Sequence, residues 1–134
     1  MYQNRVLLIG FTGRDAEART LSNQAVQVVI SLATRSSYKS KQSGEQVART
    51  EWHQVVAWGK LGEFAASIKK GSLIAVEGEL RSREYPDKTY AEVRRRVWEI
   101  RADSILKLER AERSRPEEGG TGVPPEPVEV AEPF

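Results

Sequence analysis

Short apolar runs separated by polar stretches dominate most of the sequence. Where apolar and polar residues alternate, or where β-branched residues cluster, the pattern is typical of β-strands. The run at 25–34 is the clearest case, with four apolar residues on one face: Val26, Val28, Ile30 and Leu32. The same reasoning predicts strands over five ranges: 5–10, 25–34, 50–58, 72–85 and 97–108.

Alternation also predicts which side chains share a face of two of these strands. In 50–58, Trp52 and Trp58 fall on one face and His53 on the other. In 72–85 the pattern directs three apolar residues inward: Ile74, Val76 and Leu80. The opposite face of that strand carries two cations and an aromatic ring: Arg81, Arg83 and Tyr85.

Residues 60–70 change to a helical period. Four apolar residues fall at i, i+3, i+4 and i+7: Leu61, Phe64, Ala65 and Ile68. Lys69 and Lys70 suit a last helical turn, and Gly71 is a stop signal. The spacing predicts one short amphipathic helix between the third and fourth strands.

The stretch at 35–49 is polar and basic, and it predicts a long hairpin loop around Ser43 and Gly44. The element order is then strand, strand, strand, helix, strand, strand. That order favours an all-β fold with one short helix, the OB-fold, which is a five-stranded Greek-key barrel that binds oligonucleotides or oligosaccharides.

Charge divides the chain into two parts. Residues 1–115 hold all 21 Lys and Arg against 14 acids, a net charge of +7, whereas 116–134 hold five acids and no base. The last stretch also contains five of the six prolines. We therefore predict an OB domain over 1–110 and a disordered acidic tail over 111–134, with a body suited to a polyanion.

The composition offers little for catalysis. There is no cysteine, and His53 is the only histidine, so neither a thiolate site nor a nucleophile–base pair is indicated. No phosphate-cradling glycine motif occurs. We expect no enzymatic activity, no catalytic residues, no metal and no cofactor. Without an apolar stretch of about 20 residues we also expect no membrane association and a cytoplasmic location.

Aromatic residues lie among cations. Binding of single strands without sequence preference needs cations that follow the phosphates and aromatic faces on which bases stack. Tyr38 adjoins Lys39 in the polar stretch and has no apolar partner nearby, which favours a functional role. For Trp52 and Trp58, periodicity alone leaves core packing and base stacking both open.

Four segments resemble the bacterial single-stranded DNA-binding protein family in order and spacing. They are NRVLLIGFTGRDAEAR (4–19), SLATRSSYKSKQSGE (31–45), TEWHQVVAWGKLGEFAASIKKGSLIAVEGELRSREY (50–85) and WEIRADSI (98–105). The block from Thr50 to Tyr85 carries most of the specificity.

The resemblance implies a function and a set of site residues. The implied function is coating of single-stranded DNA in replication, recombination and repair by a homotetramer in the cytoplasm, associated with the nucleoid, with His53 near a subunit contact. The implied stacking positions are Tyr38, Trp52, Trp58 and Tyr85. The basic residues that we expect to contact phosphates are Arg35, Lys39, Lys60, Arg81 and Arg83.

The end of the chain is similar to the family's acidic C-terminal tip, which ends in Pro-Phe. Phe134 offers an aromatic ring together with its α-carboxylate, which a basic pocket on a partner can bind. The implied docking residues for replication and repair proteins are Glu129, Glu132, Pro133 and Phe134.

The sequence leaves two alternative functions open, and one run of arginines departs from the family's pattern. The chain could be an RNA-binding OB module, or an adaptor that docks proteins through Phe134 and binds DNA weakly. The run Arg94, Arg95 and Arg96, expected in a loop before the last strand, could extend the DNA path or lie on a solvated hairpin.

Overall fold

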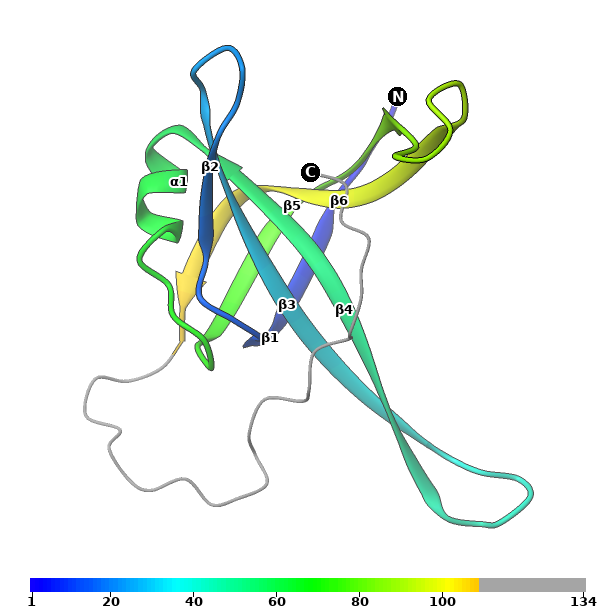
Figure 1. Ribbon diagram of the computed structural model, residues 1–134. Coiled ribbons are helices and arrows are strands. Elements are labelled where there is room, and N and C mark those ends of the chain that lie inside the picture. The colour runs from blue at the N-terminus through cyan, green and yellow to red at the C-terminus, as the bar shows by residue number, and fades with distance from the viewer. Residues whose placement is uncertain (109–134) are drawn as a thin grey trace.

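The computed structural model describes residues 1–108, which form a barrel of strands with one short helix (Figure 1). The elements in chain order are β1 (Val6–Thr12), β2 (Glu17–Thr20), β3 (Val26–Lys39), β4 (Gln46–Trp58), α1 (Gly59–Ala65), β5 (Leu73–Pro86) and β6 (Arg94–Lys107). The five predicted strands and the helix between the third and fourth of them are confirmed. The four-residue strand β2 was not predicted.

The barrel closes because β1 pairs with two different strands. Its first part is antiparallel to β5, and Phe11 and Thr12 then pair with Ala33 and Leu32 of β3. Antiparallel β3–β4 and β5–β6 pairs and a parallel β4–β6 pair complete the circuit. The result is the predicted OB-fold, a closed mixed barrel of five strands, with β2 added beside β3.

Gly10 lies where β1 passes from one partner strand to the other. A Cβ atom at this position would stand 2.0 Å from the carbonyl oxygen of Ala33. Only glycine allows the two backbones to approach this closely, so closure of the barrel requires glycine at this position.

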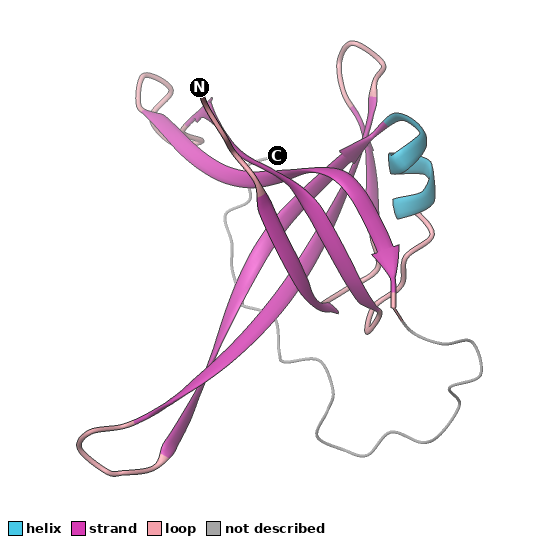
Figure 2. Ribbon diagram, turned by 180° about the vertical axis from the view of Figure 1, so that it is seen from behind, coloured by secondary structure: helices cyan, strands magenta, loops and turns pink. Residues whose placement is uncertain are grey.

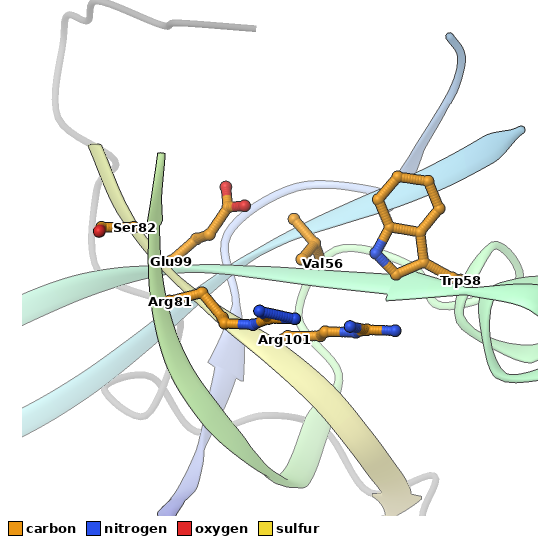
Figure 3. A pocket seen from close by; sticks show the side chains of 6 residues that line it. All are labelled: Val56, Trp58, Arg81, Ser82, Glu99 and Arg101. Carbon is orange, nitrogen blue, oxygen red and sulfur yellow. The ribbon is translucent and has the colours of Figure 1, made fainter. Parts of the chain in front are cut away.

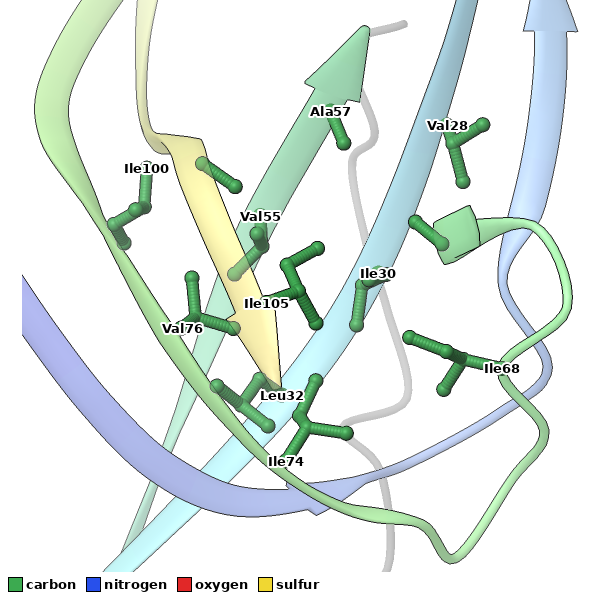
Figure 4. Packing of buried hydrophobic residues seen from close by; sticks show 12 residues of the cluster. Val28, Ile30, Leu32, Val55, Ala57, Ile68, Ile74, Val76, Ile100 and Ile105 are labelled. Atoms are coloured by element: carbon green, nitrogen blue, oxygen red, sulfur yellow. The ribbon is translucent and has the colours of Figure 1, made fainter. Parts of the chain in front are cut away.

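The inward faces of the strands form a single apolar core (Figure 4). β3 contributes Val28, Ile30 and Leu32, as predicted, and the whole cluster is Val28, Ile30, Leu32, Val55, Ala57, Ala65, Ile68, Ile74, Val76, Ile100, Ala102 and Ile105. The inward assignment of Leu80 was wrong: this residue is exposed because it lies beyond the last buried residue of β5, Gly78. Val26, which was predicted only to share a face with Val28, is exposed because it lies beside the β2–β3 turn.

The helix is shorter than the predicted 60–70. It ends at Ala65, and the amide groups of Ser67 and Ile68 bond to carbonyls only three residues back. Tertiary contacts explain the early end, because Asp15 accepts a hydrogen bond from the amide of Lys70 at 2.9 Å. Ile68 is buried as predicted, but Phe64 is exposed and does not join the core.

The predicted loop at 35–49 is mostly strand. β3 continues to Lys39 and β4 starts at Gln46, so the turn spans only 40–45, where Gly44 has a φ of +75°. This β3–β4 ribbon extends well beyond the barrel (Figures 1 and 2). Polar residues can form it because backbone hydrogen bonds, rather than apolar side chains, hold a two-stranded ribbon together.

Candidate nucleic-acid interface

The two tryptophans of β4 lie on the outside of the barrel. Val55 and Ala57 occupy the inward positions of this strand and are fully buried in the core. Alternation therefore turns Trp52 and Trp58 outward, where both side chains are half-buried. The structure decides the question that periodicity left open: neither ring belongs to the core.

Neighbouring strands extend this outer face on both sides. On β3, Ala33 pairs with Trp52, so the outward face of that strand carries Arg35 two residues further on. On β5, Arg81 and Arg83 lie outward, opposite Glu99 and Val97 of β6. We call this surface of β3, β4, β6 and β5 the outer face. It brings together Trp52, Trp58, Arg35, Arg81 and Arg83 of the predicted site.

A polar network lies at the centre of the outer face. The Oε1 atom of Glu99 accepts hydrogen bonds from Nε2 of Gln54 at 3.2 Å and from Nε of Arg83 at 3.4 Å. These three residues come from β6, β4 and β5 respectively. The network therefore ties three strands together beneath the surface that holds the tryptophans.

Beside this network the outer face is hollowed into a shallow pocket of about 370 Å³ (Figure 3). Its lining is Val56, Trp58, Arg81, Ser82, Glu99 and Arg101. An indole ring next to two guanidinium groups can hold a stacked base and its phosphate at the same time.

Arg101 is a candidate site residue that our sequence reasoning missed. It lies between two buried residues of β6, Ile100 and Ala102, so alternation alone could have placed it on the outer face. Within residues 1–108 its guanidinium forms no ion pair, which leaves it available to an anionic ligand.

Three predicted residues lie apart from this group. Lys39 lies near the tip of the β3–β4 ribbon, and Lys60 lies in the first turn of α1; both are exposed. Tyr38 pairs with Val47, and its even position in β3 sets it on the opposite side of the ribbon from Trp52. Because the ribbon protrudes, Tyr38 is still 55% exposed.

Tyr85 lies near the outer end of β5, where it pairs with Arg95 and shares a face with Arg81 and Arg83, as predicted. The three arginines are not in a loop, because β6 already starts at Arg94. Arg94 and Arg96 both lie against Glu84, at 3.7 and 2.8 Å, and Arg95 contacts Asp87 at 2.8 Å. The hydrogen bond from Arg95, followed by the backbone amide of Tyr90, lowers the pKa of Asp87.

His53 faces the end of the barrel rather than the outer face. Its Nε2 atom lies 2.8 Å from the hydroxyl of Thr34. Burial lowers the pKa of His53, and the nearby carboxylate of Glu51 offsets this only in part. Trp98, two residues before Ile100 on the adjoining strand, lies at the same end of the barrel and is 57% exposed.

Within residues 1–108, no three His, Asp or Glu side chains are grouped so that they could hold a metal ion. Nor does any helix there have the length and apolarity needed to span a bilayer. The predicted tail over 111–134, with Glu129, Glu132, Pro133 and Phe134, lies outside the described residues.

A closed OB barrel with tryptophans and arginines on one outer face defines a protein of the oligonucleotide-binding type. The chain belongs to the single-strand binding protein family, whose model matches residues 3–108. The fold is also that of a solved Plasmodium falciparum SSB complex with ssDNA, with a TM-score of 0.71 and 21% sequence identity. That match covers 81% of this chain and 97% of the other.

Proposed function

We propose that this protein binds single-stranded DNA without sequence preference and without catalysis. The observation that carries the proposal is the outer face, where Trp52 and Trp58 lie among arginines on the closed barrel. Bases would stack on the rings, at about 1–3 kcal/mol each, while the arginines neutralise phosphates. One OB domain of this type occupies roughly 4–16 nucleotides.

The physical basis of binding predicts its dependence on salt and strandedness. Each phosphate that a cation neutralises releases counterions, so log K should fall with log salt by about 0.7 per neutralised phosphate. Duplex DNA encloses its base faces within the stack. It should therefore bind much more weakly than an unstructured single strand.

Competition between matched oligonucleotides tests this proposal. Unlabelled single-stranded DNA, single-stranded RNA and duplex DNA of equal length would compete with a labelled oligothymidylate. We expect DNA single strands to compete best and duplex worst. Preference for RNA would favour the alternative of an RNA-binding module, since a stacking surface accepts either sugar unless a group reads the 2′-hydroxyl.

We further propose that the protein assembles as a homotetramer, because residues 1–108 carry two separate apolar surfaces. Leu7, Ile9 and Leu106 point outward from β1 and β6 and are 66%, 56% and 60% exposed. They form a continuous row, since Ile9 pairs with Ala75 of β5 and Ala75 pairs with Leu106. We call this row the β1–β6 patch.

The second surface lies at the end of the barrel, where exposed Leu80 and Trp98 lie close to the row that holds His53. We call it the barrel-end patch. A dimer with twofold symmetry needs one self-complementary patch, whereas a tetramer built from two kinds of twofold contact needs two. Two distinct patches therefore favour a tetramer and agree with the expected place of His53 near a subunit contact.

We also propose that the protein is of the bacterial type of the family and acts in replication, recombination and repair, in the cytoplasm near the nucleoid. We propose that it recruits partner proteins through Glu129, Glu132, Pro133 and Phe134. The acidic sequence that leads to Pro-Phe supports this recruitment. A chain ending at Arg115 should keep DNA affinity and lose protein partners. If the full chain and the shortened one both bind DNA weakly while only the full chain binds partners, the adaptor alternative holds.

A further inference from the structure

Glu99 is an acidic residue in the middle of a face that we propose binds a polyanion. It is 7% exposed, and no other ionisable residue within 1–108 is buried to the same degree. A carboxylate beneath the phosphates would by itself repel the ligand. Its presence there therefore calls for a physical role.

The contacts of Glu99 point to that role. Its carboxylate accepts hydrogen bonds from Arg83 and Gln54, so the buried charge is paired, as burial of a charge requires. Arg83 has a long side chain with several rotatable bonds, and about a third of it, 32%, is exposed on the outer face. Holding its Nε atom restricts the direction in which the guanidinium points.

We infer that Glu99 is a positioning residue, which holds Arg83 in the orientation that binds phosphate on the outer face. The inference rests on the proposed DNA binding. Glu79 offers the contrast on the same face: its carboxylate is more exposed, and it lies 3.9 Å from Arg81 at the surface. Glu79 therefore serves as a control for the simple effect of removing one negative charge.

The substitution Glu99→Gln gives opposite results for positioning and for simple repulsion. It removes a negative charge and leaves a neutral oxygen that bonds Arg83 less strongly. Repulsion alone predicts tighter binding of oligothymidylate and an unchanged salt slope. Positioning predicts binding that is about threefold to tenfold weaker, with a slope smaller by about 0.7 because Arg83 no longer neutralises a phosphate. Glu79→Gln should bind as tightly as the wild type or more tightly.

A double-mutant cycle shows whether Glu99 acts through Arg83. In an Arg83→Ala background, Glu99→Gln should cause no further weakening, because the residue that it positions is absent. Equal weakening in both backgrounds would overturn the inference, as would tighter binding by the single variant. Circular dichroism and thermal melting of each variant would show that the barrel is intact.

A second variant keeps the test decisive if Glu99→Gln does not fold. Arg83→Lys keeps the positive charge but lacks the Nε–H group that Glu99 holds. It should reproduce both the weaker binding and the smaller slope, and wild-type behaviour in this variant would refute the inference. If the wild type itself does not bind oligothymidylate, the proposed function fails, which is a different result from wild-type binding with unaffected variants.

Discussion

The two faces of β4 carry residues with different roles. Val55 faces the core and contributes to stability, whereas Trp52 faces outward and belongs to the proposed binding surface. His53 belongs to neither group, since its ring is partly buried at the end of the barrel against the hydroxyl of Thr34. Its protonation state therefore bears on stability and on any subunit contact made there.

Acid should destabilise the protein in part through His53. Burial lowers its pKa in the folded state below the unfolded value of 6.5. As the pH falls below about 6.5, the unfolded chain gains a proton that the folded chain binds only at lower pH, so the stability present above pH 6.5 is progressively lost. Urea unfolding at pH 7.5 and 5.0, at one protein concentration, should show a larger loss for the wild type than for His53→Gln. Equal losses would contradict this assignment.

At the scale of elements, the spacing of apolar residues was sufficient to predict the five barrel strands, from short runs and alternation, and the helix, from its longer period. It could not reveal β2, whose residues EART contain no apolar alternation and pair with β3 through the backbone. The predicted end of β3 was also too early, because the ribbon beyond Thr34 is held by backbone hydrogen bonds and not by apolar side chains. The helix end depended on a contact with Asp15, which lies far away in sequence.

For the candidate site residues, too, local patterns were predictable from the sequence, and contacts between strands were not. Outward positions such as Arg81 could be predicted from alternation, but the network through Glu99 joins three strands whose neighbourhood only the fold establishes. Tyr38 looked like a loop residue because its neighbours are polar. The pairing of Tyr38 with Val47 shows instead that it lies on a strand, across the ribbon from Trp52.

The β5–β6 hairpin tests whether the DNA path continues past the barrel. Arg94, Arg95 and Arg96 are bound to Glu84 and Asp87, which stabilises the hairpin, but two arginines share Glu84 and leave excess positive charge. Replacing all three by glutamine should weaken oligothymidylate binding and lower the salt slope by about 0.7 for each phosphate that these arginines neutralise. Unchanged affinity and slope would mean that the arginines serve only the hairpin.

For the whole molecule, the arrangement of surfaces separates binding from assembly. The tryptophans and arginines lie on the outer face of β3, β4, β6 and β5, whereas the β1–β6 patch lies on the part of the barrel that includes β1. Four copies could therefore associate through their apolar patches and still expose their outer faces to DNA.

Disrupting one apolar patch should reduce the number of subunits in the assembly from four to two. Ile9→Arg places a charge in the centre of the β1–β6 patch and should convert a tetramer to a dimer, because the barrel-end patch is unchanged. Adding Trp98→Arg should yield monomers. Light scattering after size-exclusion chromatography measures each mass, with Val26→Arg as the control at an exposed apolar residue outside both patches. A monomeric wild type, or a tetrameric Ile9→Arg variant, would contradict the proposal.

Tryptophan fluorescence during titration with an unstructured oligothymidylate, at low and high salt, tests the central claim most directly. For the wild type at low salt we predict strong quenching that saturates at a fixed ratio of nucleotide to protein. At high salt binding is weaker, so the same quenching should require more DNA. Trp52→Ala should reduce the quenching and weaken binding by about 1–3 kcal/mol, whereas Trp52→Phe should retain most of the affinity because a ring remains. If the wild type shows neither quenching nor binding at low salt, the outer face is not a DNA-binding surface.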